Sequence, residues 1–469
     1  MAISFTKNNK TSILIVMNIV HYIIGIPPYR HGGAPAYAID LLKQQSLCKD
    51  IHTSILLPGD ISCFRHVSRI KTSKYKIGNI RCYKIINPTV SPLMYGLKKA
   101  EYILADQRNF SRRSLEKYYE DVRPDIIHVH TLMGLPKDFL SFMKAKGVKL
   151  VITSHDYYGL CPKVNLVDCN GQICQDSSGC LCAECNQFAK PKWLLRVLNS
   201  TFFLKVKKYL PRSAAKYRNQ SNSSYELVRF SNDADSQFVY LKNYYIDMFS
   251  MFDAFHFNSN ISKMVYEKSI SLPYHEVIPI TTGAINDRRK KKKFGKIVRM
   301  AFIAGLGNAK GFPMLKEILM EFAQNGYSDW HLEVWGGEST GTDEQLNNIE
   351  FKGRFSQSQL SAIYDSIDLV LVPSVWYETF SLVALEALSF GVPVLMSNHV
   401  GAQLLIDKIA PDFIFNGKEE LKFKLKNIFC NPQILTTFNE KLLNSNIINF
   451  SETKHANDIL EFYKRVIKL

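Results

Sequence analysis

The chain has 469 residues but lacks a run of apolar residues long enough to cross a membrane. A spanning helix needs about 20 mostly apolar residues, and the best candidate, Ile13 to Ile26, is shorter and is interrupted by Asn18 and His21. This segment also lacks the marks of a signal peptide, because mostly polar residues precede it and no small-residue cleavage site follows. We therefore expect a buried first strand here, and a protein that stays in the cytoplasm.

The chain also lacks internal repeats of fixed period, and the six cations from Arg288 to Lys293 are its only low-complexity tract. Apolar residues make up 46% and charged residues 22%, which excludes bulk disorder. Acidic residues are few beside basic ones, 42 against 59, so the net charge is +17. This excess favours an anionic partner, whether nucleic acid, anionic lipid or phosphorylated substrate, although a basic proteome without such a partner is the alternative.

Short apolar runs alternate with helix-like stretches along most of the chain. Two of the strands expected in the N-terminal half fall within Arg123 to Thr131 and Val148 to Asp156. This βαβα order predicts an α/β fold with parallel, doubly wound sheets. Ligands bind such sheets at the carboxyl ends of the strands, where His130, His155 and Asp156 stand.

The length favours two domains over three, and we predict two Rossmann-like domains with the active site in the cleft between them. The N-terminal, acceptor-side domain spans residues 1–285 and includes a cysteine-rich and basic helical insertion at about 157–250. Residues 286–297 form a basic linker, which we interpret as a solvated loop. The C-terminal, donor-binding domain spans 298–450, and 451–469 form a helix that could pack back on the N-terminal domain.

The sharpest signal lies between Pro373 and Leu395, where Glu378 and Glu386 stand eight residues apart. The residues between them indicate the start of a helix, with Thr379 or Ser381 as its cap. Free N–H groups at a helix start bind phosphate, and carboxylates accept hydrogen bonds from sugar and ribose hydroxyls. From the spacing alone, an ordinary capped helix with two surface acids is an equal alternative.

This segment, with "PS-x-W-Y-E" before the helix and "G-V-P-V" after it, resembles the Glu-x7-Glu motif of the retaining glycosyltransferases of family 4, which have the GT-B fold. The resemblance covers about residues 12–450. It implies that Glu378 contacts the donor sugar and that Glu386 holds the ribose. The backbone groups that would meet the sugar and the diphosphate belong to Phe380, Ser381 and Leu382.

Further positions follow the same family pattern. Lys310 in "GNAKGFPML" would neutralise the departing diphosphate. Gly32 and Gly33 would let the backbone approach a phosphate or the acceptor. His155 would lie near the transferred sugar and Gly283 near the donor. Taken alone, these features are also typical of a surface lysine, an ordinary turn and a structural histidine.

The chain departs from the family pattern in two places, one of which lies at Gly401, Ala402 and Gln403, where the family has Gly-Gly and Glu after "G-V-P-V". The family usually carries an arginine shortly before the lysine, where this chain has Ala304 and Gly305, and Arg354 is a candidate replacement. No side chain qualifies as a covalent nucleophile. The resemblance therefore implies transfer with retention by a front-face route that the leaving diphosphate assists, without a catalytic metal or other catalytic cofactor.

Six of the ten cysteines lie between Cys161 and Cys185. In a reducing compartment such a cluster favours a metal over disulfides, and Cys182-x2-Cys185 has metal-knuckle spacing. Similar insertions occur in a subset of the family's bacterial polysaccharide enzymes. We predict that Cys161, Cys174, Cys182 and Cys185 hold a structural zinc ion, with an iron–sulfur cluster or free thiols as alternatives.

The stretch from Lys190 to Arg218 has nine Lys or Arg and no acidic residue, and aromatic and leucine side chains stand among them. This pattern is typical of a helix on an anionic membrane surface. A helix packed on the sheet with a solvated cationic face is the alternative. We place the protein as a peripheral protein at the inner face of the membrane.

Together these features predict a glycosyltransferase that moves a sugar from a nucleotide-sugar donor to a glycan or lipid-linked acceptor in cell-surface polysaccharide synthesis. Nucleic acid is not an expected partner. One alternative is a sugar-nucleotide epimerase of similar fold, which needs no acceptor cleft. The other is a zinc-containing nucleic-acid-binding protein, which leaves Glu378 and Glu386 unexplained.

Overall fold

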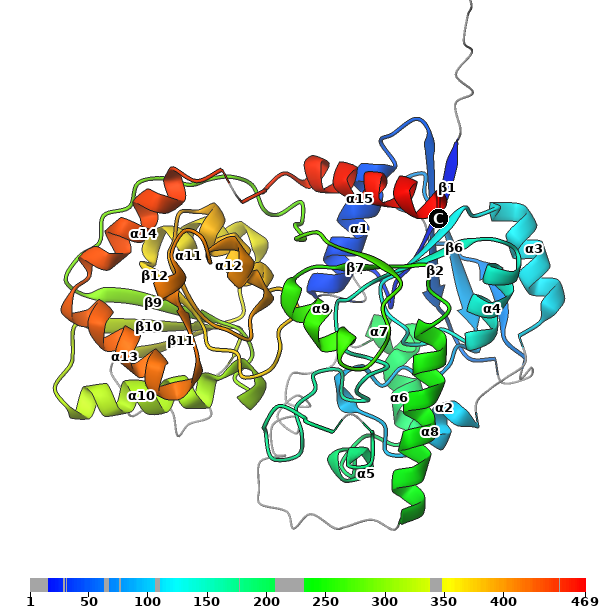
Figure 1. The fold of residues 1–469 in the computed structure, drawn as a ribbon, viewed down its shortest axis with the longest axis horizontal. Coiled ribbons are helices and arrows are strands. Elements are labelled where there is room, and N and C mark those ends of the chain that lie inside the picture. Colours follow the sequence, from blue (N-terminus) through cyan, green and yellow to red (C-terminus); the bar gives the residue numbers. More distant parts are fainter. Residues whose placement is uncertain are drawn as a thin grey trace, which may run out of the picture.

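The structure is a computed structural model of the chain, and it shows two α/β domains side by side (Figure 1). The described residues are 16–27, 30, 32–62, 67–75, 77–105, 110–176, 178–206, 232–337, 348–446 and 448–469, with the backbone alone for 232–235.

The N-terminal domain is built on an eight-stranded sheet in the order β3-β4-β2-β1-β5-β6-β7-β8. Every neighbouring pair is parallel except β3 and β4. The strands are β1 (Met17–Tyr22), β2 (Ile51–Pro58), β3 (Arg69–Thr72), β4 (Arg81–Ile86), β5 (Ile126–Val129), β6 (Lys149–Thr153), β7 (Ala254–Phe257) and β8 (Tyr274–Val277). The helices outside the insertion are α1 (Gly33–Gln45), α2 (Glu101–Leu104), α3 (Arg112–Val122), α4 (Lys137–Ala145) and α9 (Asn260–Glu267).

The C-terminal domain is built on a six-stranded, all-parallel sheet in the order β11-β10-β9-β12-β13-β14. Its strands are β9 (Val298–Ile303), β10 (Trp330–Trp335), β11 (Ile349–Gly353), β12 (Leu369–Val372), β13 (Val394–Ser397) and β14 (Ile414–Phe415). Its helices are α10 (Phe312–Gln324), α11 (Leu360–Ser366), α12 (Leu382–Ser389), α13 (Gly417–Cys430) and α14 (Gln433–Leu443). Two parallel-sheet α/β domains were predicted, and the structure confirms them.

The composition of the central strands explains this architecture. All four residues of β12 (Leu-Val-Leu-Val) are buried, and so are all four of β5 (Ile-Ile-His-Val). Strands that are buried on both faces read as continuous apolar runs, because helices cover both sides of a parallel sheet. In β5 the run is broken by a polar side chain, His128, which the sequence alone does not explain.

The predicted insertion lies between β6 and β7 and forms a helical layer below the first sheet in Figure 1. Its helices are α5 (Cys182–Cys185), α6 (Lys192–Asn199), α7 (Thr201–Val206) and α8 (Asn232–Phe249). Part of the predicted membrane-binding stretch, including Lys207 and Lys208, lies outside the described residues.

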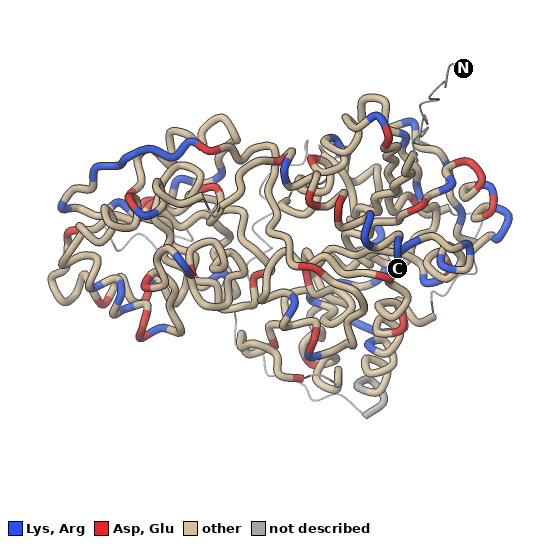
Figure 2. The backbone as a smooth tube through the Cα atoms, turned by 45° about the horizontal axis from the view of Figure 1, so that its top comes forward, with Lys and Arg blue, Asp and Glu red and all other residues tan. Residues whose placement is uncertain are grey.

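The basic run Arg288 to Lys293 is a loop in which four cations, Arg288, Lys290, Lys291 and Lys293, are exposed, but the other two are held by the C-terminal domain. Figure 2 shows it as a continuous blue stretch along the C-terminal domain. Lys292 is only 7% exposed, and its ammonium donates to the carbonyl oxygens of Tyr364 and Ile367, both at 2.6 Å. Arg289 donates to two further carbonyls of this domain. Carbonyls left free at the ends of helices attract cations, and here they hold the run in place.

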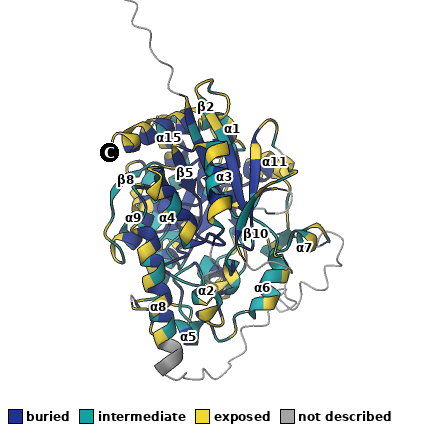
Figure 3. Ribbon diagram, turned by 90° about the vertical axis from the view of Figure 1, so that its right-hand side faces the viewer, coloured by how far each residue is buried: buried dark blue, intermediate teal, exposed yellow. Residues whose placement is uncertain are grey.

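The chain ends in helix α15 (Glu452–Ile467), which returns to the N-terminal domain and packs against α1 (Figures 1 and 3). His455 and the hydroxyl of Tyr37 lie 3.0 Å apart. Arg465 forms a bidentate ion pair with Glu276, at 2.7 and 2.9 Å. Within the described part of the chain, no helix combines the length and the apolar character needed to cross a bilayer.

Candidate active site

The structure brings Lys310 and Glu378 together at the carboxyl edge of the second sheet. Lys310 follows β9 and Glu378 follows β12, and these strands are neighbours. The Lys310 ammonium lies 2.8 Å from one carboxylate oxygen of Glu378, and Ser374 donates to the other oxygen at 2.5 Å. The ammonium also lies over the ring of Trp376. Two predicted donor residues that stand far apart in the sequence of this domain are therefore in direct contact.

Gly311 makes this approach sterically feasible. Its φ is +77°, and a Cβ atom there would lie 1.8 Å from the carbonyl oxygen of Pro373. Only glycine lets two backbones come so close with this conformation. The Lys-Gly pair of the sequence motif is thus a cation followed by the residue that allows its turn to reach the end of β12.

Helix α12 starts as the motif predicted, but it is not capped as we predicted. Neither Thr379 nor Ser381 caps it with its side chain. Thr379 instead donates its hydroxyl hydrogen to the carbonyl oxygen of His155, at 3.1 Å. The first N–H groups of α12 therefore have no side-chain acceptor, which is the arrangement that binds a phosphate.

Glu386 lies in the second turn of α12 and accepts a hydrogen bond from the hydroxyl of Tyr364, at 3.1 Å. Burial raises the pKa of its carboxyl to about 7, and the Tyr364 hydrogen bond opposes this rise. A carboxyl that titrates near neutrality accepts hydrogen bonds from a diol once it is deprotonated. The contact of Tyr364, on α11, with Glu386 was not predicted, because no local sequence pattern links this tyrosine to the motif.

The two domains meet directly beside this motif. Ser259, before α9, donates to the carbonyl oxygen of Thr379 at 2.6 Å. A Cβ atom on Gly33 would lie 3.2 Å from the side chain of Leu382. Together with the contact between Thr379 and His155, these place the predicted residues His155 and Gly33 of the first domain against the start of α12.

His155 ends a chain of buried histidines. Its Nε2 lies 3.0 Å from Nδ1 of His130, whose Nε2 lies 3.0 Å from Nδ1 of His21. The Nε2 of His21 lies 2.9 Å from Oε1, the side-chain amide oxygen of Gln45. Because that oxygen only accepts, each ring donates from Nε2, and Nδ1 of His155 is left without a proton. Burial lowers the pKa of His155 to about 3 and that of His21 to about 4, so the rings are neutral at physiological pH.

A second polar group beside His155 is Asp156. Burial raises the pKa of its carboxyl to about 6. Its Oδ1 accepts a hydrogen bond from the amide of Tyr158 at 2.9 Å, and its own carbonyl accepts one from the hydroxyl of Tyr266 at 2.8 Å. Both contacts hold the turn that follows β6, so Asp156 fixes the position of His155.

Three predicted positions have other surroundings. The amide of Gly283 donates to Asp40 of α1 at 3.0 Å, and the glycine lies beside Glu452 of α15. The contacts of Gly283 are therefore with helices α1 and α15 and not with the donor residues. Gly32 precedes α1 with φ +137°. Arg354 follows β11 and is exposed.

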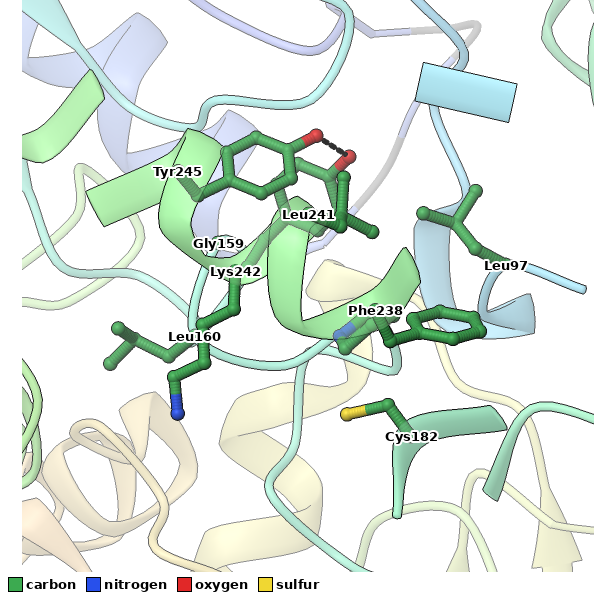
Figure 4. A pocket seen from close by; sticks show the side chains of 10 residues that line it. Leu97, Gly159, Leu160, Cys182, Phe238, Leu241, Lys242 and Tyr245 are labelled. Carbon is green, nitrogen blue, oxygen red and sulfur yellow. Dashed lines mark hydrogen bonds between the residues drawn. The ribbon is translucent and has the colours of Figure 1, made fainter. Parts of the chain in front are cut away.

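The predicted cysteines gather around α5. The described cysteines are all free thiols. Burial raises the pKa of Cys182 above its usual range, and the nearby thiols of Cys161, Cys185 and Cys174 raise it further. Burial also raises the pKa of Cys185 to about 12, with Cys169 beside it. Figure 4 shows Cys182 at a small cavity under Phe238 and Leu241 of α8.

Two groups of described residues bring three metal-ligating atoms within 4.8 Å of one another. One is His21, His128 and His130, all buried, and the other is His331, Glu333 and Glu350 on β10 and β11. Neither contains a cysteine, so the zinc assignment of the cysteine cluster stays a prediction. In the histidine group, His21 and His130 are joined in the chain that ends at His155. The ring nitrogens of His128 are hydrogen-bonded to Tyr463 and Thr153.

Comparison with known proteins supports the interpretation of this geometry. Residues 298–429, which include Lys310, Glu378 and Glu386, match the family described as glycosyl transferases group 1. The chain is 23% identical over 419 residues to an uncharacterized 42.6 kDa protein in the cps region of Klebsiella pneumoniae, covering 86% of this chain and 89% of that protein.

Similar solved structures identify the fold as GT-B. Sucrose-phosphate synthase from Thermosynechococcus elongatus is 13% identical with a TM-score of 0.56, covering 96% of this chain and 99% of that chain. Anabaena HepE in complex with UDP and glucose is 13% identical with a TM-score of 0.54, over 96% and 99%. The catalytic domain of starch synthase IV from Arabidopsis thaliana, bound to ADP and acarbose, is 14% identical with a TM-score of 0.51, over 97% and 100%.

Proposed function

We propose that this protein is a retaining glycosyltransferase that moves a sugar from a nucleotide-sugar donor to a glycan or lipid-linked acceptor. The observation that carries the proposal is the pair formed by Lys310 and Glu378 at the open start of α12, with His155 of the other domain in contact with the same loop. This geometry offers a diphosphate both a cation and free N–H groups. It offers a sugar a carboxylate that accepts hydrogen bonds. The family match over residues 298–429 supports it.

In this proposal each residue has a distinct task. Lys310 and the first N–H groups of α12 neutralise the diphosphate as charge develops on it. Glu378 accepts hydrogen bonds from sugar hydroxyls, and Glu386 accepts them from the ribose. The bond from the anomeric carbon to the diphosphate breaks while the bond to the acceptor oxygen forms on the same face. The acceptor's proton passes to the leaving phosphate oxygen, so no covalent nucleophile is needed.

The cellular role follows from the relative encoded in a cps region. We propose cell-surface polysaccharide synthesis, with the protein at the cytoplasmic face of the membrane. The exposed apolar residues of α6 and α7, described below, support a peripheral membrane contact.

The two glutamates provide the test, because they should contact opposite ends of the donor. Glu386→Ala should weaken binding of both the nucleotide diphosphate and the intact donor, since both contain the ribose. Glu378→Ala should spare the nucleotide diphosphate but depress transfer. Loss of a hydrogen bond to a charged group costs about 1.5–3 kcal/mol, which corresponds to about ten- to a hundred-fold.

The measurement is calorimetry with UDP, GDP and dTDP and their sugar conjugates, together with turnover. Glu317→Ala is the matched control, because Glu317 is an exposed glutamate of the same domain that pairs with Lys418. If both site variants bind and turn over like the control, the donor site lies elsewhere and the proposal fails.

A further inference from the structure

A cavity of about 720 Å³ lies in the N-terminal domain, apart from the donor residues. The loops that follow β1, β2 and β4 form one side, and α6 and α7 form the other. Its volume is that of a small-molecule site, and it opens at the carboxyl edge of the sheet, where α/β folds bind ligands. The loop after β1 lines the cavity and leads to Gly33, which touches Leu382 of the donor motif. The cavity therefore adjoins the junction of the two domains.

The charges that line this cavity are almost all positive. Its cations are Arg30, Lys71, Lys74, Lys84, Arg196 and Lys205. Its single carboxylate, Asp60, already accepts hydrogen bonds from the amide and the hydroxyl of Thr201, at 3.0 and 2.6 Å. These bonds fasten the start of α7 to the loop after β2. Among the described residues of the lining, the one acid thus anchors a helix and forms no ion pair with Arg30, Lys71 or Lys84.

Lys71 and Lys84 are directly opposite each other in the antiparallel pair of β3 and β4. Side chains in such positions point to the same face of the sheet, and like charges there are destabilising. Both line the cavity, Lys71 exposed and Lys84 half-buried, and neither forms an ion pair with a described residue. An anion between the two ammonium groups would relieve their repulsion.

Arg30 is partly buried, and burial lowers the pKa of its guanidinium. It donates to the side-chain oxygen of Asn199. The amide nitrogen of Asn199 is held by the carbonyls of Ser91 and Leu195, at 2.8 and 2.7 Å, so its oxygen must face the arginine. A neutral amide orients a guanidinium without compensating its charge. A partly buried, oriented arginine with no carboxylate partner among the described residues is the group that binds phosphate through paired N–H donors.

We propose that this cavity binds the acceptor substrate through a phosphate group, with Arg30 as the recognition residue and Lys71 and Lys84 as supporting cations. The word acceptor rests on the proposed function, whereas phosphate binding at this site does not. A phosphorylated sugar and the head of a phosphorylated lipid share this chemistry. Trp193 on α6 and Phe202 on α7 are exposed beside the cavity, which suits the lipid source.

The experiment compares Arg30→Met with Lys310→Met, so that one cation is removed from each site. Calorimetry uses glycerol 3-phosphate as the soluble phosphate probe and UDP as the donor-site probe. We expect Arg30→Met to weaken glycerol 3-phosphate binding by about ten- to a hundred-fold and to leave UDP binding unchanged. Lys310→Met should show the reverse. Thermal melting checks the fold, and Lys84→Met, a milder change in the same cavity, stands in if Arg30→Met does not fold.

Vesicle arms distinguish the two sources of phosphate. Flotation is measured with phosphatidylcholine vesicles that carry either phosphatidic acid, a phosphate monoester, or an equal amount of phosphatidylglycerol. A preference for phosphatidic acid that Arg30→Met abolishes indicates a lipid-linked acceptor, and glycerol 3-phosphate binding without that preference indicates a soluble one.

Three results would overturn the proposal: no binding of either phosphate probe by the parent, equal binding by Arg30→Met and the parent, or loss of glycerol 3-phosphate binding in Lys310→Met alone. Failure of the parent to bind any nucleotide would instead count against the proposed function, and the phosphate result would still stand.

Discussion

Ser381 has an unfavourable backbone conformation at the centre of the proposed donor site. Its φ is +103°, a region that residues with a Cβ atom rarely adopt. The loop is fixed on either side, since Phe380 is buried and its carbonyl accepts a hydrogen bond from the amide of Ala402 at 2.8 Å. Such strain costs of order 1–3 kcal/mol and persists where the surroundings determine it. Here it positions the first N–H groups of α12.

Replacing Ser381 by glycine should therefore stabilise the protein. We expect Ser381→Gly to raise the free energy of unfolding by about 1 kcal/mol and Ser381→Val to lower it, as measured by urea denaturation. Ser389→Gly, at the other end of α12, is the control with the opposite sign, because glycine within a helix costs about 0.5–1 kcal/mol. A Ser381→Gly variant that unfolds at lower urea than the parent would show that the loop is not strained.

At this scale the sequence predicts the charged residues of the site but not their partners. Lys310 and Glu378 stand in a recognisable motif, and the structure places them in contact. Thr379 was expected to cap a helix, yet it bonds to His155, which lies 224 residues away in the chain. His21 and Gln45 were missed for the same reason, since only the packing of α1 on the sheet joins them to His155. Contacts between distant residues leave no local pattern.

Among the elements, the layer from α5 to α8 contains the cysteine cluster for which we predict a structural zinc ion. Helix α5 packs on α8, and the thiols around it have raised pKa values because they are buried, among them Cys161 and Cys182. Bound zinc would remove the thiol protons and link this loop-rich segment to the helix behind it.

Purified protein should therefore contain about one zinc per chain, and Cys185→Ser should lower both the metal content and the melting temperature. Cys430→Ser is the control, because Cys430 is exposed and lies in the other domain. Metal analysis by mass spectrometry and thermal melting are the measurements. Metal-free parent protein with the same melting temperature and activity would leave no role for zinc.

Helices α6 and α7 present large apolar side chains to solvent beside their cations. Trp193 is 66% exposed and Phe202 is 76% exposed. Lys192 and Lys205 stand on the same two helices. Aromatic side chains interspersed with lysines are typical of helices that lie in a membrane interface.

The double variant Trp193→Ser, Phe202→Ser should bind liposomes less well than the parent and melt at a similar temperature. Binding of the parent should rise with the anionic lipid content and fall with salt, since each cation near such a surface contributes about 1 kcal/mol. Phe423→Ser is the matched control, because this phenylalanine is 69% exposed on α13 of the other domain. Sedimentation that is equal with neutral and anionic vesicles, or absent with both, would exclude this contact.

At the scale of elements, hydrophobic patterns predict most of the strands but not what covers or extends them. Strands β5 and β6 fall within the two predicted segments, Arg123 to Thr131 and Val148 to Asp156. Strand β3, with the sequence Arg-Ile-Lys-Thr, has no such pattern and exists because it pairs with β4. Within the run from Arg288 to Lys293, the sequence did not single out Arg289 and Lys292, because their partners are backbone carbonyls of α14 and α11, which no sequence pattern reveals.

In the whole molecule, the C-terminal helix links the two domains. A layer of histidines lies between this helix and the first sheet. α15 leaves the second domain and covers one face of the first sheet together with α1. Between them lie buried histidines of β1, β5, β7 and α15 and the side chains of Tyr37 and Tyr463, which contact His455 and His128. The buried histidines of this layer are His21, His128, His130, His256 and His455. His155 adjoins the layer at the domain junction, where it is hydrogen-bonded to His130.

These histidines should make the protein sensitive to mild acid. Burial lowers the pKa of His21 and His256 to about 4 and that of His155 and His455 to about 3, and it lowers those of His128 and His130 well below the usual value. The unfolded chain binds these protons first, near pH 6.5. The stability that the neutral rings contribute is therefore complete above about pH 6.5 and is lost as the pH falls. Three buried or partly buried carboxyls act in the opposite direction, since their pKa values are raised: Glu386 to about 7, Asp156 to about 6, and Glu452, but they are fewer than the six histidines.

We expect the free energy of unfolding to fall steeply between pH 6.5 and pH 5, by up to about 1.4 kcal/mol per pH unit for each histidine. His455→Gln should lower stability at pH 7, because it loses the contact with Tyr37, but its stability should fall less steeply with acid by about one proton. His52→Gln, at an exposed position of β2, should keep the slope of the parent. Urea denaturation at several pH values measures all three. A parent whose stability is constant from pH 7 to pH 5 would mean that the histidines are solvated and that α15 does not seal this face of the sheet.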